Sequence, residues 1–259
     1  MGHIRLGKLP HTKKWKQVVS LLDSGASTAD IALATLQASQ KGLQEASKDP
    51  TLIYATWLLT QIPLAAKSSN FSEELSKIGL EVSQQPSLME VMGAFTAAVD
   101  TYASRKGIRS DLGEMAQLAA VESLTKLAGD KTKSLFGATT EDVQKALGSL
   151  SSTKEFSTLG RDFFARFLRR HLTYFLSREL SNHVGPNRRF VNIHEHGEFN
   201  DALDHYCQQS ARIVKEFAGG WFSKANYEGG IDLEKARIFA YSALKKIGGE
   251  LGLDIGSYE

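Results

Sequence analysis

The sequence predicts an all-α protein, an irregular globular bundle of about nine to ten helices that forms no repeat solenoid. Pairs of a Ser or Thr with an acid three residues later, which favour the first turn of a helix, recur along the chain. Apolar residues at helical spacing follow these pairs, and patterns typical of strands have little support. The pairs are unevenly spaced, which disfavours a solenoid of equal repeats.

The expected helix starts are marked by residues that cap the first turn. Four pairs fit the capping pattern and a fifth is looser: Ser27 with Asp30, Ser87 with Glu90, Thr139 with Asp142, Ser152 with Glu155, and Asn70 with Glu73. The clearest helix follows Ser87, because apolar residues from Leu88 to Tyr102 recur at intervals of three and four and share one face. Gly107 is expected to end this helix.

The helix boundaries follow from the same patterns. A first helix has Trp15 and Leu22 on one face, and the further predicted helices span residues 27–47, 51–62, 71–79, 87–107, 110–128, 140–149, 153–183, 198–217 and 232–248. The five prolines are expected at helix boundaries. The glycine pairs 219/220, 229/230 and 248/249 are expected to mark breaks in the last third of the chain.

The size of the chain allows one domain. With 259 residues, of which 42% are hydrophobic, it can bury the core of a single helical domain over residues 1–259. A possible subdivision separates residues 1–135 from residues 136–259, because the segment around this point is rich in Gly, Ser and Thr. The only cysteine, Cys207, excludes an intramolecular disulfide and a four-cysteine zinc site.

Neither a secretory signal nor a membrane span is expected. The first residues are basic but lack the apolar stretch of a signal peptide. The most apolar window, from Leu52 to Ala66, contains polar residues and Pro63, and it is shorter than the roughly 20 residues that cross a bilayer. We therefore expect a cytoplasmic protein that has no membrane partner.

Positive charge is concentrated in two segments, although the net charge is only +2. Residues 1–20 and residues 161–190 each carry a net charge of +5, and the rest of the chain carries −8. The basic residues of the first segment are Arg5, Lys8, Lys13, Lys14 and Lys16. The second segment includes Arg188 and Arg189 at its end. This asymmetry favours an anionic partner.

The second basic segment includes an arginine stripe, formed by Arg166, Arg169 and Arg170 on one face of the helix predicted over 153–183. The other faces are rich in Phe and Leu, so we expect this helix to be central in the fold. Three interpretations of the stripe stay open. The arginines are solvated or paired within the protein, they bind phosphate or an acidic partner, or the helix lies on a membrane surface.

The tail before the first helix also has two interpretations. It is either a frayed terminus or an extended basic arm that docks on a partner, because isolated apolar residues such as Ile4 and Leu6 alternate with basic ones.

Common catalytic motifs are absent from the sequence. It contains no GxxxxGK[ST], GxGxxG, HExxH, CxxC or GxSxG pattern, so the corresponding nucleotide-binding, zincin, redox and hydrolase mechanisms have no support. We expect Cys207 and His171 to be core residues rather than reactive groups. No cofactor is expected.

Histidines and acids gather between residues 183 and 207. His194 and His196 form a His-x-His pair, and His183 and His205 lie nearby in the sequence, so the four could act as metal ligands. A general acid or base role for one histidine, and plain exposure of solvated side chains, are the alternatives.

These observations favour a noncatalytic subunit or adaptor of a cytoplasmic complex over an enzyme. Its basic arm and arginine stripe would bind nucleic acid or an acidic protein. An accessory component of a bacterial antiviral system is one adaptor of this kind that the sequence leaves open. The alternative is a metal-dependent hydrolase that uses His183, His194, His196 and His205.

Overall fold

The computed structural model describes residues 9–132 and 138–256. Within these ranges the chain forms twelve α-helices and one short 3-10 helix. The same ranges contain no strand, and one isolated bridge joins Val184 and Phe190. The all-α prediction is therefore confirmed, but the expected nine to ten helices are too few.

The α-helices have the following bounds: α1 (Lys13–Asp23), α2 (Thr28–Ala38), α3 (Gln40–Ala46), α4 (Pro50–Ala65), α5 (Phe71–Lys77), α6 (Leu88–Lys106), α7 (Asp111–Gly129), α8 (Thr140–Ser149), α9 (Thr153–Leu180), α10 (Ile193–Ser210), α11 (Arg212–Tyr227) and α12 (Leu233–Glu250). The 3-10 helix spans Ser181–His183 and directly follows α9.

The four capping pairs begin helices as predicted. Ser27, Ser87, Thr139 and Ser152 each accept a hydrogen bond from the backbone N–H three residues later. At α8 the Asp142 carboxylate also accepts from the backbone N–H of Thr139, which completes the reciprocal pair. Asn70 occupies the cap position of α5 without capping its backbone by the side chain.

Two predicted helices are each divided in the structure, which accounts for most of the difference in number. The helix expected over 27–47 breaks at Ser39, whose hydroxyl donates to the carbonyl of Thr35. The helix expected over 198–217 instead begins at Ile193 and ends at Ser210, and α11 follows after Ala211. Asn192 explains the earlier start, because its side chain accepts from the N–H of Glu195.

Three predicted breaks lie inside helices, one of them at Gly248 and Gly249 in the last turn of α12. Pro63 is in the last turn of α4, where it removes one backbone donor without preventing the helix from reaching Ala65. Gly219 and Gly220 lie within α11. A Cβ atom on Gly219 would lie 2.0 Å from the carbonyl oxygen of Thr153, so this glycine permits close packing of α11 on α9. Gly229 and Gly230 do separate two helices, with φ angles of 95° and 88°.

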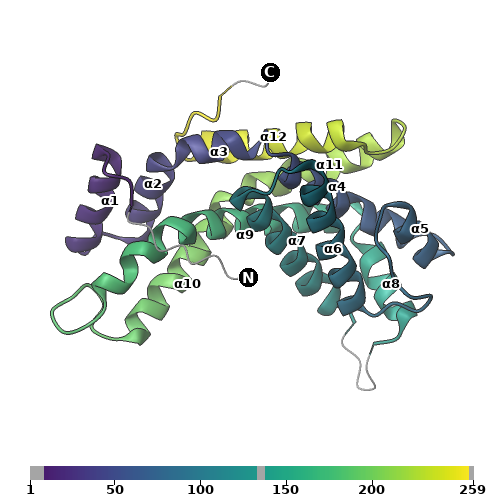
Figure 1. Cartoon of the computed structure of the whole chain (residues 1–259), viewed down its shortest axis with the longest axis horizontal. Coiled ribbons are helices and arrows are strands. Elements are labelled where there is room, and N and C mark those ends of the chain that lie inside the picture. The colour runs from purple at the N-terminus through teal and green to yellow at the C-terminus, as the bar shows by residue number, and fades with distance from the viewer. Residues whose placement is uncertain (1–8, 133–137, 257–259) are drawn as a thin grey trace.

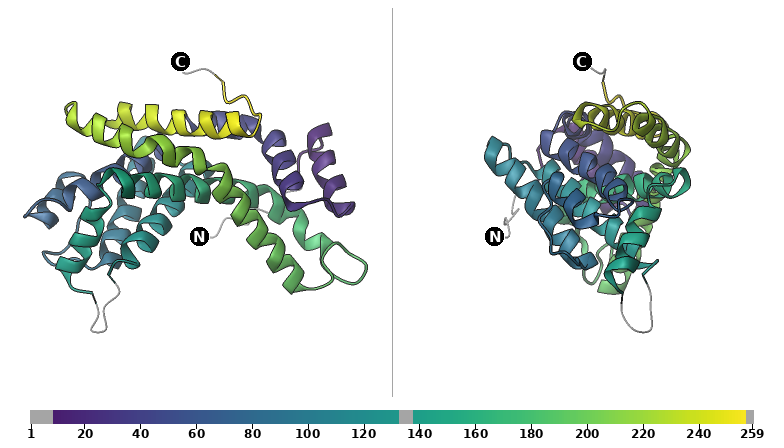
Figure 2. Two further views of the ribbon diagram at one scale, coloured as in Figure 1. Left: turned by 180° about the vertical axis from the view of Figure 1, so that it is seen from behind. Right: turned by 90° about the vertical axis from the view of Figure 1, so that its right-hand side faces the viewer.

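The long helix α9 runs through the middle of the molecule and packs against α2, α7, α10 and α11 (Figure 1). At one end α1 packs on α2, and α2 packs on α10. At the other end α4 contacts α5, α6, α7 and α8. Helix α12 lies along α11 and α4, as the view from behind also shows (Figure 2). The central place predicted for α9 follows from its apolar residues, because Phe156, Phe163, Phe164 and Phe167 are fully buried.

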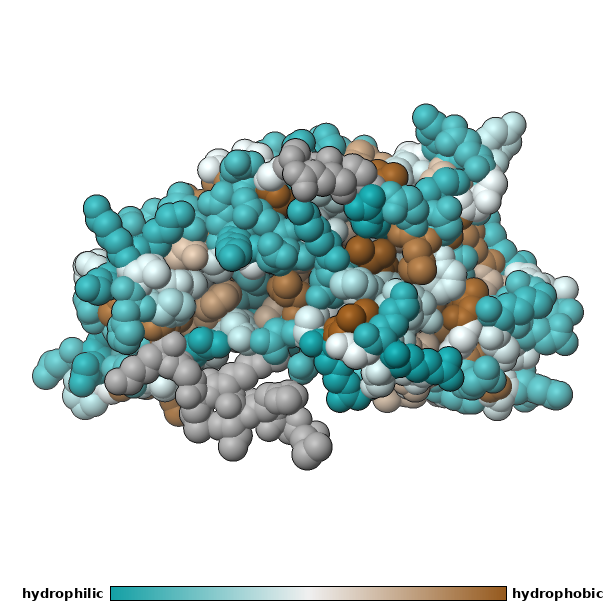
Figure 3. Space-filling model, turned by 45° about the horizontal axis from the view of Figure 1, so that its top comes forward, coloured by the Kyte–Doolittle hydropathy of each residue, from teal (hydrophilic) through white to brown (hydrophobic). Residues whose placement is uncertain are grey.

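Helices from both parts of the possible subdivision share one cluster of buried hydrophobic residues, which extends from Leu9 to Ile255. The Trp57 indole N–H on α4 donates to the carbonyl of Ile231, 2.9 Å away and just before α12. On the surface, hydrophobic residues appear in separate patches among hydrophilic ones on the face shown in Figure 3. None of the helices in the two described ranges combines the length and the apolar character that a membrane span requires.

Candidate functional site

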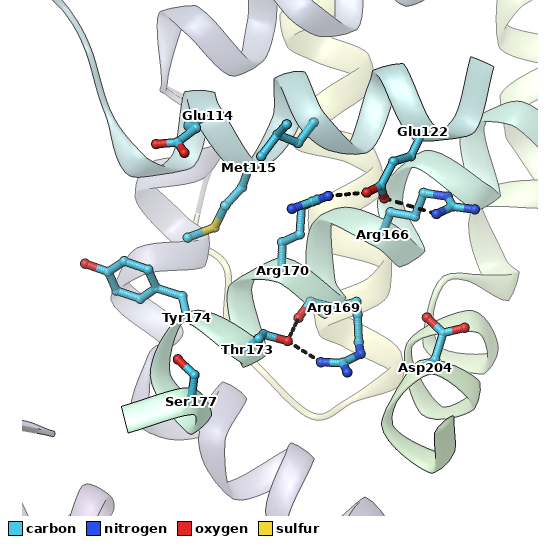
Figure 4. Close-up of a pocket in the computed structure, with 11 residues that line it drawn as sticks. Glu114, Met115, Glu122, Arg166, Arg169, Arg170, Thr173, Tyr174, Ser177 and Asp204 are labelled. Carbon is cyan, nitrogen blue, oxygen red and sulfur yellow. Dashed lines mark hydrogen bonds and ion pairs between the residues drawn. The ribbon is translucent and has the colours of Figure 1, made fainter. Parts of the chain in front are cut away.

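The arginine stripe of α9 lines a pocket of about 430 Å³ that is also bounded by α7 and α10 (Figure 4). Helix α7 contributes Glu114, Met115, Leu118 and Glu122, α9 contributes Arg166, Arg169, Arg170, Thr173, Tyr174 and Ser177, and α10 contributes Asp204. Volumes of this order suit small ligands. Helical spacing correctly predicts that the three arginines share one face of α9. The pocket itself depends on how α7 and α10 pack around α9.

Two of the three arginines are neutralised within the protein. The Glu122 carboxylate on α7 accepts from both Arg166, at 3.0 Å, and Arg170. Arg166 also donates to Asp162 at 2.6 Å. Burial opposes the charge of Asp162, but the hydrogen bond and charge of Arg166 outweigh it and keep the pKa of Asp162 below its ordinary value. These contacts correspond to the interpretation in which the arginines are paired internally.

Arg169 differs from the other two arginines, because no carboxylate of the described residues forms a salt bridge with it. Its guanidinium donates to the Thr173 hydroxyl and, at 2.8 Å, to the side-chain oxygen of Asn200 on α10. Asn200 is oriented by its own amide N–H, which donates to the His196 carbonyl at 2.8 Å. Arg169 is thus held by uncharged groups, and no salt bridge within the described residues balances it at the pocket wall.

Asp204 on α10 lines the same pocket as Arg169 (Figure 4). Its exposed carboxylate makes no hydrogen bond or salt bridge to any other described residue. Ser177 is likewise exposed and has no side-chain partner within the described ranges. Glu114 and Tyr174, by contrast, already interact with other groups. The polar groups that remain available are therefore one cation, one anion and one hydroxyl.

A second basic surface is formed by α1. Lys13, Lys14 and Lys16 are exposed, while Trp15 between them is buried and packs on Phe175 of α9 at a ring distance of 4.7 Å. Lys14 donates to the Gln37 carbonyl at 3.2 Å. None of the three lysines forms a salt bridge with a described carboxylate, and the first turn of α1 contains no acid. Arg5 and Lys8 lie outside the described residues.

Arg188 and Arg189 follow α9 in the loop that leads to α10, and they lie in different environments. Arg188 is exposed, and its side chain has no partner among the described residues. Arg189 donates to the carbonyls of Leu22 and Ala26, at 3.4 and 2.5 Å, and thereby fastens the loop to the end of α1. Burial lowers the pKa of Arg189 from its ordinary value. Arg188 thus shares one end of the molecule with α1, whereas Arg189 has a structural contact.

The four histidines of the possible metal site do not converge. His183 is buried, with Nδ1 3.6 Å from a carboxylate oxygen of Asp23, and His194 is exposed. His196 is part of the contact with Asn200, and His205 is exposed on α10. Across the described ranges, no group of three or more His, Cys, Asp or Glu side chains is arranged to hold a metal ion.

The chain matches no protein-family model, no curated protein and no solved structure. The residues that sequence analysis missed are Glu122 and Asn200, which position the arginines, and Asp204 as a pocket residue. Periodicity could have placed each on its own helix, but no local pattern connects α7 or α10 with α9.

Proposed function

We propose that this protein is a noncatalytic subunit or adaptor of a cytoplasmic complex, and that its basic end binds an acidic segment of a protein partner. The basic end consists of Lys13, Lys14 and Lys16 on α1 together with Arg188. The observation that carries the proposal is that these exposed cations have no carboxylate partner among the described residues. The proposal does not include an antiviral role, for which no described residue provides support.

The position of the lysines strengthens this proposal. Lys13, Lys14 and Lys16 lie in or next to the first turn of α1, where the helix dipole already places positive charge. Cations at this end destabilise a helix slightly, so the helix dipole does not account for their presence. An acidic partner would interact favourably with both the lysines and the free N–H groups of the first turn.

An acidic protein segment fits better than nucleic acid. Strong nucleic-acid binding typically uses about 6–10 cationic contacts to phosphates. The arginine stripe adds little to this number, because Arg166 and Arg170 are paired with Glu122. The basic end has only four exposed cations, which is fewer than this number and suits a short acidic segment.

The test compares two labelled probes by fluorescence anisotropy over a range of salt concentrations. The probes are a poly-glutamate peptide and a single-stranded DNA of equal charge. We expect the full-length protein to bind the peptide, and the combined variant K13Q/K14Q/K16Q to bind it several-fold more weakly. The variant K41Q/K48Q/K67Q is the matched control, because it removes three exposed lysines elsewhere.

Three outcomes would contradict the proposal. Equal peptide binding by the wild type and the α1 variant would show that the three lysines do not contact the peptide. Equal losses in the α1 and control variants would indicate attraction to net charge alone. Tighter binding of DNA than of peptide, with a steep dependence on salt, would favour a nucleic-acid partner instead.

A further inference from the structure

The pocket between α7, α9 and α10 contains charged side chains that have no role in the function proposed for the basic end. Arg166 and Arg170 share Glu122, and Arg166 also pairs with Asp162, so both arginines already contact carboxylates of the protein. Arg169 and Asp204 carry opposite charges on the pocket wall and do not pair with each other. The pocket therefore presents one available cation and one available anion to the same space (Figure 4).

The separation of Arg169 from Asp204 follows from how Arg169 is held. Its guanidinium donates to Thr173 on its own helix and to Asn200 on α10. Asn200 precedes Asp204 by one helical turn, so the guanidinium bonds to α10 one turn before Asp204, with which it forms no salt bridge. Two of the five guanidinium N–H groups are used in this way, and the others remain able to donate to a ligand.

A ligand with a single charge suits this pocket poorly. An anion that binds Arg169 comes close to the Asp204 carboxylate, which repels it, and a cation at Asp204 is repelled by Arg169. A ligand that carries both signs avoids both repulsions and satisfies both side chains. Met115 and Leu118 of α7 provide an apolar surface in the same pocket.

We propose that this pocket binds a small zwitterion of the amino-acid type. Its carboxylate accepts hydrogen bonds from Arg169, its ammonium group donates to Asp204, and its apolar part lies against Leu118. The volume of about 430 Å³ accommodates a ligand of this size. This site shares no residue with the basic end, so the result of either experiment does not affect the other proposal.

The experiment measures binding of probes that differ in which charges they carry and in how far apart the charges lie. L-Leucine carries both charges, 4-methylpentanoate lacks the ammonium group, and 3-methylbutylamine lacks the carboxylate. Two further zwitterions, 4-aminobutyrate and 5-aminopentanoate, place the charges farther apart. Binding to the full-length protein is followed by calorimetric titration and by ligand-observed NMR. We expect at least one zwitterion to bind about tenfold or more tightly than both single-charge analogues.

Two variants test the assigned roles. Arg169→Gln is expected to abolish the preference for the zwitterion. Asp204→Asn is expected to weaken binding of the zwitterion and to strengthen binding of 4-methylpentanoate, because the repelling charge is gone. Arg212→Gln and Asp201→Asn are matched controls, since both residues are exposed and lie outside this pocket. Circular dichroism and melting temperature verify that each variant is folded.

The Asp204→Asn result separates a binding site from a structural contact, because a purely structural residue would not reverse the preference for charge. The proposal is overturned if none of the zwitterions binds at millimolar concentrations. It is equally overturned if 4-methylpentanoate binds the wild type as tightly as the best zwitterion, or if Asp204→Asn and Asp201→Asn have the same effect.

Discussion

His171 lies in the core on α9, where its Nε2 is 3.0 Å from the Ser39 hydroxyl. Burial lowers its pKa from 6.5 to about 4. Between these values the unfolded chain binds a proton that the folded protein does not, so stability falls as the pH falls. We expect His171 to contribute a loss of about 3 kcal/mol between pH 7 and pH 4.

Urea unfolding of the wild type and of His171→Met over this pH range measures that contribution. The variant removes the titrating group and leaves the other titrations in place, so its free energy of unfolding should depend less steeply on pH. Identical slopes for the two proteins would show that His171 is protonated with an ordinary pKa in the folded state.

Cys207 is the only thiol in the protein, and it faces the core from α10. Burial raises its pKa to about 12, so almost none of it is thiolate at neutral pH. We expect the folded protein to react with a disulfide reagent such as DTNB about a thousandfold more slowly than free cysteine does. The urea-unfolded protein should react at the ordinary rate, and rapid labelling of the folded protein would disprove the buried state.

At the scale of helices, close packing of α11 on α9 depends on Gly219. Its backbone N–H donates to the Ser157 hydroxyl at 3.1 Å, and a Cβ atom there would collide with the Thr153 carbonyl. We expect Gly219→Ala to destabilise the protein by about 3 kcal/mol, because α11 must move away from α9. The urea midpoint followed by circular dichroism measures this change.

The adjacent Gly220 provides the control for this prediction. It is exposed, and a Cβ atom on it would meet nothing within 4 Å. Gly220→Ala should stabilise the protein by up to about 1 kcal/mol, since alanine favours the helix. Similar effects of the two substitutions would mean that helix propensity, not packing against Thr153, governs both positions.

Helix α1 is expected to show opposite effects of one substitution on stability and on binding. Lys13→Glu places a negative charge at the first position of α1, where it interacts favourably with the helix dipole. We expect the melting temperature to rise by about 1–3 °C while binding of poly-glutamate weakens. A fall in both quantities would show that Lys13 has a stabilising contact in the protein.

The sequence predicted helices best where a local contact determines the boundary. Ser87 and Thr139 begin helices because their hydroxyls bond to N–H groups three residues away, and such a pattern can be recognised in the sequence. The break predicted at Gly219 was wrong. A glycine that ends a helix and a glycine that lets a neighbouring helix pack closely cannot be distinguished in the sequence. The break at Ala211 has no such local signal.

At the scale of the whole molecule, the candidate site was predicted only in part. The positions of Arg166, Arg169 and Arg170 on one face follow from helical spacing within α9. Helical spacing does not predict which arginines pair with a carboxylate, because Glu122 comes from α7 and Asn200 from α10. Which arginine is neutralised depends on how three helices pack, and that arrangement involves contacts between residues far apart in the chain.

The same long-range packing predicts how the protein unfolds. Helix α4 packs on α12 and α7 packs on α9, so residues on both sides of the possible division at 135/136 contribute to one core. Separating the two parts would expose the buried faces of α4 and α9 to water, which makes a half-folded state unfavourable. We therefore expect a single cooperative transition, with coincident urea curves from far-UV circular dichroism and from tryptophan fluorescence. Trp15, Trp57 and Trp221 report on different regions, so two separate transitions would instead establish that the parts fold as independent units.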